Sequence, residues 1–449
     1  MTEPAQMTEA AQAPNADLAA RFVALSLLEE VLQRGQSLDI TLERHEGFRS
    51  LPSRDRGFCR MLTATTLRRL GQVDDLIKRT EERPDTSRPP LLQNILRLGT
   101  AQIVFMDVPD HAAVDTSVRL TESYGYERQK GFVNGMLRNI IRTQQEIVKR
   151  QDPARLNTPE WMLRGWIEDY ELRTAAEIAM ANLSEAPLDI TIKSEEERNY
   201  WASNLQASQL ATGTLRRIGL GGAVYEFEGF EEGAWWVQDA AAAIPAKLFG
   251  DVNGQHVIDL CAAPGGKTAQ LLAQGAHVTA IDRSAQRLKR LRENLERLKL
   301  NANVDVQVSD ASAWRPSKPA ERILLDAPCT ATGTIRRHPD ILHLKTANDM
   351  KSLMTLQAAI LQNAFDMLMP GGILVYCTCS LQKAEGEHQV ERLLRENQKA
   401  ARVPIGREEI GKLDDLLTED GDVRILPFHL ASQGGMDGFY IARLTKLEG

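Results

Sequence analysis

Hydrophobic residues recur at helical spacing through the first third of the chain. The stretch ADLAARFVALSLLEEVLQRG (16–35) places apolar side chains three to four positions apart and stops at a glycine. Further segments of this kind, separated by turns at Gly and Pro, cover 56–79, 89–106, 112–125 and 130–150. We predict an all-helical bundle over residues 17–150, preceded by a polar, disordered tail at residues 1–16.

The pattern changes twice after the bundle. Residues 151–236 mix helical segments with two strand-like runs, APLDITIKS (186–194) and AVYEFEGF (223–230), which predicts a small α+β linker domain. From residue 237 to 449, apolar strands alternate with helices, which predicts one doubly wound parallel sheet with helices on both faces. The six expected strands are HVIDL (256–260), HVTAID (277–282), VDVQVS (304–309), RILLDA (322–327), GILVYCTC (372–379) and GFYIARL (438–444).

Length and composition are those of an ordinary globular protein with two or three domains: 449 residues, 43% hydrophobic and 26% charged. We expect no membrane span, because no run of about 18 apolar residues is present. The polar N-terminus has no secretory pattern. Five cysteines, an odd number without metal-ligand spacing, favour a reducing, cytoplasmic compartment and argue against a metal site.

Charge is distributed unevenly along the chain. The net charge of −7 argues mildly against a nucleic-acid partner. Residues 49–150, however, hold 18 Lys and Arg against 12 Asp and Glu, a local charge of +6. This excess suits either an RNA-binding face or a solvated helical surface, and charge alone does not separate the two.

The stretch LCAAPGGKT (260–268) ends in the manner of a triphosphate-binding loop. Cys261 stands where that loop needs its first glycine, and Pro264 removes a backbone N–H that would face phosphate. The small residues Ala262, Ala263, Gly265 and Gly266 nevertheless lie between a predicted strand and a predicted helix. We therefore predict a cofactor-binding turn of a nucleotide fold rather than a phosphate cradle.

Two acidic residues at strand ends are candidates to bind the rest of a nucleoside. Asp282 lies 16 residues after Gly266, near the spacing at which a carboxylate accepts ribose hydroxyl protons, although Asp at strand ends also caps helices. Asp310 ends the third strand, where an acid could meet the amino group of adenine.

Two thiols follow the ends of two further strands. Asp326, Pro328 and Cys329 leave the fourth strand, and Cys379 ends the fifth. Ligands bind at the carboxyl ends of such sheets, so both sulfurs can share one crevice. A free cysteine is often simply buried, but two of them beside a nucleotide turn favour function.

These segments carry a family resemblance. DLCAAPGGKT, LLDAPCTATGTIRRHPDI and VYCTCSLQKAEGE resemble the signature segments of the RNA (cytosine-5) methyltransferases, which use S-adenosylmethionine. The helical segments ILRLGTAQIVFMDVPDHAAV and KGFVNGMLRNIIR are similar to the NusB-like RNA-binding domain. This combination resembles the Sun/Fmu group of bacterial enzymes, which methylate small-subunit ribosomal RNA. The segment LDITIKS departs most from that pattern.

The resemblance implies a multidomain protein: a NusB-like bundle, a small α+β domain and a Rossmann-like methyltransferase domain. It implies that Cys379 is the nucleophile that attacks carbon 6 of cytosine and that Cys329 acts in release. Cys377 is the rival nucleophile, since residues two apart share one strand face, but only Cys379 fits the TCS motif. Asp326 is expected to meet nitrogen 3 and the exocyclic amine of the base, with a raised pKa that allows protonation of nitrogen 3.

The resemblance also suggests further contacts. S-adenosylmethionine carries no phosphate, which agrees with Cys261 and Pro264 in the turn. Lys267 is expected to meet either the cofactor carboxylate or Asp326. Arg336, Arg337 and His338 follow the fourth motif and are candidate RNA contacts.

The predicted partner is 16S ribosomal RNA, and the protein is expected to be a monomer without metal. The alternatives are the same chemistry on transfer RNA, or a non-catalytic NusB-like RNA-binding factor.

Overall fold

The fold is that of a computed structural model, which describes residues 16–81, 88–218 and 222–448. The predicted tail therefore lies outside the described residues apart from Ala16. The chain divides into two compact units: residues 1–163 with 338–344, and residues 164–337 with 345–449. The first unit is helical, and the second is built on two sheets. The predicted three-domain division, 17–150, 151–236 and 237–449, stays a prediction.

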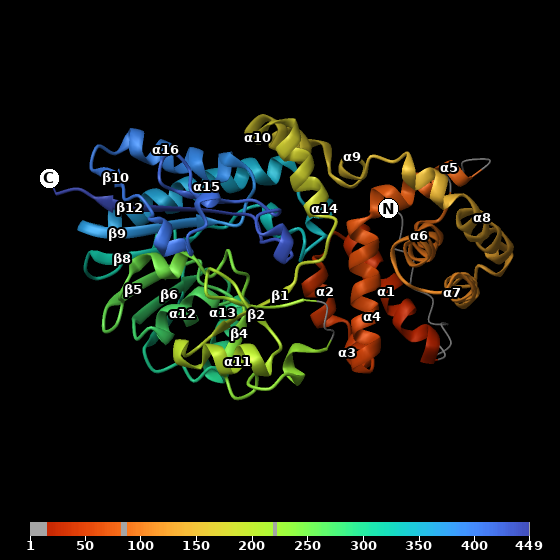
Figure 1. The fold of residues 1–449 in the computed structure, drawn as a ribbon, viewed down its shortest axis with the longest axis horizontal. Coiled ribbons are helices and arrows are strands. Elements are labelled where there is room, and N and C mark those ends of the chain that lie inside the picture. Colours follow the sequence, from red (N-terminus) through yellow and green to blue (C-terminus); the bar gives the residue numbers. More distant parts are fainter. Residues whose placement is uncertain (1–15, 82–87, 219–221, 449) are drawn as a thin grey trace, which may run out of the picture. The chain divides into compact units, whose positions relative to one another are not determined.

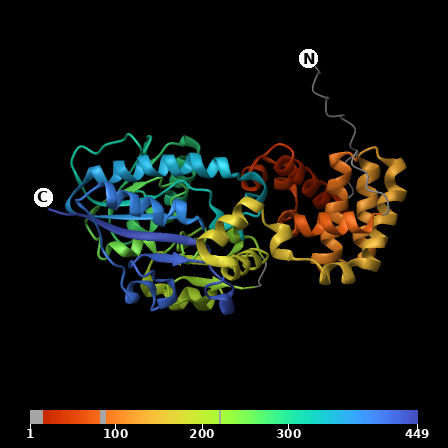
Figure 2. The same cartoon turned by 90° about the horizontal axis from the view of Figure 1, so that it is seen from above.

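The first unit confirms the helical segments expected from periodicity (Figures 1 and 2). Its continuous part contains α1 (Ala16–Leu32), α2 (Leu38–Arg44), α3 (Glu46–Ser50), α4 (Ser53–Arg68), α5 (Leu70–Thr80), α6 (Pro90–Phe105), α7 (Asp110–Ser123), α8 (Lys130–Lys149) and α9 (Pro153–Asn157). One apolar core joins these helices, and Leu25, Leu62, Leu96 and Leu137 are fully buried in it. Burial of this kind is the main driving force for a bundle.

A short helix from far along the chain completes this unit. Helix α14 (Ile341–Leu344) contacts α1 and α4. Asp340, just before α14, accepts a hydrogen bond of 3.0 Å from the backbone N–H of Leu38. The ring of His343 lies 2.8 Å from the carbonyl oxygen of Leu67, and Leu344 packs against the core. The helical unit is thus assembled from two separate stretches of sequence.

The second unit begins with α10, which starts at Glu160 and ends at Ala181, and a four-stranded antiparallel sheet in the order β2-β3-β1-β4. Its elements are β1 (Leu188–Ile192), α11 (Arg198–Asn204), β2 (Ser208–Gln209), β3 (Leu215–Arg217) and β4 (Trp235–Val237). The strand and helix predicted within 186–208 are confirmed. The strand predicted at 223–230 is wrong. A single 3-10 turn stands at Val224–Glu226, and further turns follow it, in which Gly229 has a φ of +84°.

A buried ion pair holds the small sheet in place. Arg216 in β3 makes two hydrogen bonds of 2.7 Å to the Asp189 carboxylate in β1, and neither side chain is exposed. The same guanidinium donates to the carbonyl oxygens of Gln433 and Gly435 at 3.0 and 2.6 Å. The pair therefore ties the sheet to a loop near the C-terminus.

Replacing Arg216 by methionine is expected to reduce the free energy of unfolding by about 3–5 kcal/mol, because it leaves the buried carboxylate of Asp189 without its cation. Urea denaturation checks this value. The matched control is Arg173→Met, which removes an exposed pair with Glu177 and should cost less than about 1 kcal/mol. Equal losses in the two variants would contradict the structural role of Arg216.

The larger sheet has the order β10-β12-β9-β8-β5-β6-β7, with β11 paired to β12. Its strands are β5 (His256–Leu260), β6 (His277–Asp282), β7 (Val304–Val308), β8 (Ala320–Asp326), β9 (Leu368–Thr378), β10 (Ala400–Arg402), β11 (Val423–Ile425) and β12 (Phe439–Lys446). All six predicted strands are present. Strands β5 to β9 are parallel, but β10, β11 and β12 run antiparallel, so the expected all-parallel sheet is wrong at this edge.

Helices cover both faces of the larger sheet, as the alternation of strands and helices predicts (Figure 1). Neighbouring residues of each strand enter two different cores: Val257 packs with the helices of one face and Ile258 with those of the other. The first core includes α12 (Gly266–Ala273) and α13 (Ala285–Arg297), and the second includes α15 (Ala347–Met367) and α16 (Glu387–Glu396).

Candidate active site

The predicted site residues come together at the carboxyl ends of the parallel strands. The order β9-β8-β5-β6 places the cofactor turn, after β5, between Asp326 at the end of β8 and Asp282 at the end of β6. Cys379 is the first residue after β9. This is the edge at which parallel sheets bind ligands.

The cofactor turn is built from strained and small residues. Cys261 has a φ of +62°, a conformation that a side chain adopts reluctantly, and Ala262 donates its N–H to Ile281 at 3.0 Å. Gly265 has a φ of +105°, and a Cβ there would lie 2.9 Å from Leu291 of α13. The turn therefore brings bare backbone close to the cofactor edge of the sheet. It precedes the N-terminus of α12.

Asp282 lies at the end of β6 with only 2% of its surface exposed. One carboxylate oxygen accepts from the N–H of Ser284 at 2.9 Å, and the other accepts from the N–H of Ala263, in the turn, at 3.3 Å. Arg287 of α13 forms an ion pair with the second oxygen at 3.2 Å. A buried acceptor beside the turn suits a ribose hydroxyl pair.

Asp310 lies two residues after the end of β7 and is exposed. The side chain and backbone N–H of Ser312 both donate to it, at 2.7 and 2.9 Å, and these hydrogen bonds lower the pKa of Asp310. A charged acceptor at this position fits an exocyclic amine.

Asp259, within β5, is a buried acid that sequence reasoning did not single out. The hydroxyl of Thr268 in α12 donates to one oxygen at 2.6 Å, and the other oxygen has no partner among the described residues. Burial raises the pKa of Asp259 to about 7, with the charge of Asp326 adding to the effect.

This raised pKa predicts a pH-dependent stability. The folded chain keeps a proton on Asp259 that the unfolded chain releases above about pH 4, so stability falls as pH rises from about 4 to 7. Asp259→Asn should remove this loss of stability. The free energy of unfolding of the variant should exceed that of the unsubstituted chain by up to about 4 kcal/mol at pH 7, and by little at pH 4. Denaturation at several pH values checks this.

The control for Asp259→Asn is Asp310→Asn. Its carboxyl has a lowered pKa, so the stabilisation from Asp310 is present above about pH 4 and is lost as pH falls. Between about pH 4 and 7, the stability difference for Asp310→Asn should therefore stay constant, while that for Asp259→Asn should grow. A stability difference for Asp259→Asn that stays constant across the range would contradict the buried, raised acid.

Lys267, Asp326 and Cys377 form a contiguous polar group. The Lys267 ammonium lies 2.7 Å from the Asp326 carboxylate, which is the second of the two partners predicted for it. Burial alone would lower the pKa of Lys267, but the negative charge of Asp326 and the hydrogen bond to it raise the pKa above its ordinary value. An ammonium therefore lies against the Asp326 carboxylate. This carboxylate is therefore suited to accept from an exocyclic amine.

The other oxygen of Asp326 lies 3.6 Å from the sulfur of Cys377. Cys377 is fully buried in the core, and burial, followed by the charge of Asp326, raises its pKa well above the ordinary value. Cys379 is only partly buried and follows the end of the strand, where it packs against the same apolar core that contains Cys377.

The two sulfurs predicted to act together are neighbours. Cys329 Sγ lies 3.5 Å from Cys379 Sγ, and neither cysteine is in a disulfide. The pKa of Cys329 is raised well above the ordinary value. The largest cause is the hydrogen bond between Cys329 and Cys379, and burial is the next. The loops after β8 and β9 thus present two thiols at one point of the sheet edge.

A glycine permits this approach of the loops. Gly333 donates its N–H to the carbonyl oxygen of Cys379 at 2.8 Å and accepts from the N–H of Gly438 at 2.8 Å. A Cβ on Gly333 would lie 2.0 Å from the carbonyl oxygen of Gly438 and 2.8 Å from that of Cys379. No side chain fits there. The sequence GTI gave no signal for this, because the neighbouring backbones come from distant segments.

Arg336 and Arg337 contact protein oxygens in this structure, and the RNA contact predicted for them stays a prediction. Arg337 forms ion pairs with Asp239 at 2.6 Å and with Asp437 at 3.0 Å. Arg336 is 2% exposed and donates to backbone carbonyls, among them that of Met436 at 3.2 Å. Both guanidiniums hold the loop after Cys329 against protein oxygens, which leaves them poorly placed for phosphate.

His338 belongs to the helical unit, where its ring lies 3.1 Å from the carboxylate of Asp39. Its side chain is 38% exposed. An RNA contact by His338 stays a prediction.

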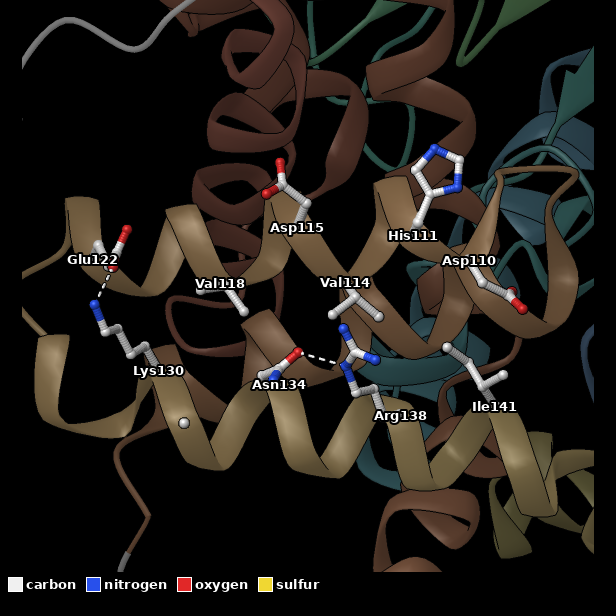
Figure 3. Close-up of a pocket in the computed structure, with 11 residues that line it drawn as sticks. Asp110, His111, Val114, Asp115, Val118, Glu122, Lys130, Asn134, Arg138 and Ile141 are labelled. Atoms are coloured by element: carbon white, nitrogen blue, oxygen red, sulfur yellow. Dashed lines mark hydrogen bonds and ion pairs between the residues drawn. The ribbon is translucent and has the colours of Figure 1, made fainter.

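The helical unit has a pocket of its own, of about 630 Å³, between α7 and α8 (Figure 3). Val114, Val118 and Ile141 supply apolar lining. The polar lining is mixed in charge: Lys130 pairs with Glu122 at 2.9 Å, and other acids and bases alternate around it. This mixture does not make a phosphate site.

The described part of the chain holds neither a cluster of metal ligands nor a helix suited to a membrane. Within residues 16–81, 88–218 and 222–448, no three His, Cys, Asp or Glu side chains are grouped so as to hold a metal ion. Nor does any helix in these ranges combine the length and apolarity needed to cross a membrane.

Comparisons with known proteins agree with this architecture. The family model described as 16S rRNA methyltransferase RsmB/F matches residues 246–445, and that of the NusB family matches residues 18–142. Ribosomal RNA small subunit methyltransferase B of Serratia proteamaculans is 33% identical, with 95% of this chain and 98% of that protein covered. The protein of that name from Pasteurella multocida is 33% identical over 96% of each chain.

One solved structure, a methyltransferase homologue from Pyrococcus horikoshii, is 26% identical and has a TM-score of 0.52. It covers 64% of this chain and 100% of its own.

Fold and site together define an RNA methyltransferase in which a Rossmann-like catalytic domain follows a NusB-type helical domain in the sequence. The chain belongs to the 16S rRNA methyltransferase RsmB/F family, whose methyl donor is S-adenosylmethionine. The residues present fit that donor: the turn offers close backbone with no phosphate nest, and buried Asp282 borders it.

Proposed function

We propose that the protein methylates carbon 5 of a cytosine in 16S ribosomal RNA through a covalent bond between Cys379 and the base. The observation that carries this proposal is the 3.5 Å separation of the Cys329 and Cys379 sulfurs at the cofactor edge of the sheet. A methyltransferase that acts on a nucleophilic nitrogen or oxygen has no need of two adjacent thiols, whereas carbon 5 of cytosine must first be activated.

In the proposed reaction, the thiolate of Cys379 attacks carbon 6 of cytosine, and a sulfur–carbon bond replaces the 5,6 double bond. Carbon 5 becomes enamine-like and can accept a methyl group. S-adenosylmethionine, when bound at the turn, would supply that methyl group from its sulfonium sulfur, which would leave as a neutral thioether. A base then removes the proton from carbon 5, and Cys379 leaves as the double bond re-forms.

The surrounding residues orient the reactants. The ammonium of Lys267 lies beside Asp326 and within electrostatic reach of Cys379, so it favours negative charge at the sulfur end of the site. The Asp326 carboxylate accepts from the exocyclic amine of cytosine. Protonation of nitrogen 3 by Asp326, predicted from the resemblance, stays a prediction. Asp282 accepts from the ribose of the donor, and Asp310 from its adenine amine. The target base must leave any stack to reach the thiols.

Small-subunit ribosomal RNA is proposed as the substrate because the relatives named above act on it and because the NusB family match covers residues 18–142. The expectations of a monomer and of a cytoplasmic location accompany this proposal. The boundaries 17–150, 151–236 and 237–449 remain the proposed division into RNA-binding, linker and catalytic domains.

The proposal predicts one new 5-methylcytosine in 16S ribosomal RNA. The purified protein is incubated with labelled S-adenosylmethionine and with 16S ribosomal RNA, assembled small subunits or transfer RNA, and bisulfite sequencing locates the modified base. Label in a single 16S cytosine is the expected result. Label confined to transfer RNA would reassign the substrate, and binding without any transfer would favour a non-catalytic RNA-binding factor.

A further inference from the structure

Glu385 is a buried acid next to the two reactive cysteines. It stands in a single 3-10 turn, Lys383–Glu385, six residues after Cys379, and its side chain is fully buried. Both of its carboxylate oxygens are hydrogen bonded. Sequence reasoning did not identify it, because its partners come from three separate segments.

Four donors surround the carboxylate. Oε1 accepts from the backbone N–H of Thr330 at 3.0 Å and from the side-chain amide of Gln357, in α15, at 2.9 Å. Oε2 accepts from the hydroxyl of Thr330 at 2.5 Å and from the hydroxyl of Ser380 at 2.6 Å. All four are neutral donors, and this is the bonding pattern of an ionised carboxylate, which accepts only.

The partners connect the two loops that carry the thiols. Thr330 directly follows Cys329, and Ser380 directly follows Cys379. One oxygen of Glu385 therefore joins the neighbours of both cysteines. A second link, from the Thr332 hydroxyl to the side chain of Gln382 at 2.5 Å, runs parallel to it. Loops held in this way at both ends keep their sulfurs at one separation.

The two sulfurs have side chains of opposite charge near them. Lys267 is the cation within reach of Cys379 and Cys377. Glu385 is the anion within reach of Cys329, and the Tyr376 ring, fully buried, lies on the same side. The charge of Glu385 adds to the effects of the Cys379 sulfur and of burial that raise the pKa of Cys329. The thiol form of Cys329 is thereby favoured.

We propose that Glu385 is a positioning residue that sets the separation of the two cysteines and keeps Cys329 protonated while Cys379 attacks. Cys329 S–H then donates to the thiolate of Cys379 across the 3.5 Å between the sulfurs. The inference rests on the proposed function for its role in turnover. Its charge effect on Cys329 does not depend on any reaction with RNA.

The test measures alkylation of each cysteine by iodoacetamide in the full chain without RNA, with mass spectrometry to separate the sites. Only thiolates react appreciably, so the pH midpoint of labelling reports the ionisation of each sulfur. In the unsubstituted protein, the midpoint for Cys329 should lie at least about 2 pH units above that for Cys379. Equal or reversed midpoints would overturn the inference, whatever the variants do.

Glu385→Gln preserves size and removes the charge, and its amide nitrogen takes the place of one accepting oxygen, where the hydroxyls of Thr330 and Ser380 can turn to accept from it. The Cys329 midpoint should fall by about 1 unit or more, and the ratio of Cys379 to Cys329 labelling at pH 7.5 should fall about 10-fold. Glu385→Asp, which keeps the charge, should restore part of the ratio. Thr332→Val is the matched control, since it disturbs the same loops without changing charge and should leave the Cys329 midpoint in place.

Turnover gives the second readout. Glu385→Gln should lower kcat by about 10-fold or more and change KM for RNA by less than about 3-fold, since RNA affinity does not depend on this buried group. An unchanged Cys329 midpoint in a folded Glu385→Gln protein would overturn the inference while leaving the proposed reaction intact. Absence of methyl transfer to cytosine in the unsubstituted protein would instead overturn the reaction and leave the labelling result standing.

Discussion

Replacing Cys379 by alanine is expected to reduce methyl transfer to RNA by about 10³-fold or more, while binding of S-adenosylmethionine stays within about 3-fold of the unsubstituted protein. The reason is chemical: without a sulfur adduct at carbon 6, carbon 5 remains part of an aromatic ring and does not attack the donor. The donor site is built from the turn after β5 and from Asp282, neither of which uses the Cys379 side chain. Labelled turnover and calorimetry measure the two effects.

Cys377→Ala is the matched control for Cys379→Ala. Cys377 lies two residues earlier but is fully buried in the core, so its loss should lower stability by about 1–2 kcal/mol and leave most of the turnover. Reversal of this pattern, with Cys377→Ala inactive and Cys379→Ala active, would transfer the nucleophile role to Cys377. Full activity in both variants would remove the covalent route altogether.

Replacing Cys329 by alanine should give the opposite outcome, a protein that attacks RNA and does not release it. Cys379 keeps its sulfur and can form the bond to carbon 6, but the neighbouring thiol at 3.5 Å is gone. A covalent protein–RNA adduct should therefore accumulate to about one RNA per chain. Denaturing gel electrophoresis detects it as a species of lower mobility that disappears after nuclease digestion.

The double variant Cys329→Ala with Cys379→Ala distinguishes the trapped adduct from tight non-covalent binding. It should bind RNA as the single variant does and give no species of lower mobility in the denaturing gel. A single Cys329→Ala protein that turns over normally, with no adduct at any time, would show that release does not use this thiol.

The sequence predicted those parts of the fold that depend on local periodicity. Apolar runs such as HVIDL and HVTAID are buried on both faces and form β5 and β6. Leu288, Leu291 and Leu295 recur at helical spacing and are the buried residues of α13. The direction of a strand carries no such local signal. GFYIARL was therefore recognised as a strand, but its antiparallel course beside β9 was not.

Some residues of the candidate site were likewise predictable from the sequence, and others were not. Cys329, Cys379, Asp326 and Asp282 stand at strand ends, and a parallel sheet collects strand ends at one edge, so their proximity followed from the topology. Arg336 and Arg337 look like phosphate ligands in sequence because nothing nearby shows their distant partners, which are Asp239 and Asp437 for Arg337 and backbone carbonyls such as that of Met436 for Arg336. Gly333 and Glu385 were missed for the same reason, because their contacts are with distant segments. Gly333 approaches the backbone of Cys379 and Gly438, and Glu385 accepts from Thr330.

The short helix α14 has a consequence for how this protein can be dissected. A fragment cut after the bundle at residue 150 or 163 would lack the segment His338–Leu344, which belongs to the helical unit. The amide of Leu38 and the carbonyl of Leu67 would lose their partners, and the core would lose the cover of Leu344. The helical unit is thus not continuous in sequence. No single continuous fragment contains all of it, and a fragment of the second unit that spans residues 164–449 also carries residues 338–344, which belong to the helical unit.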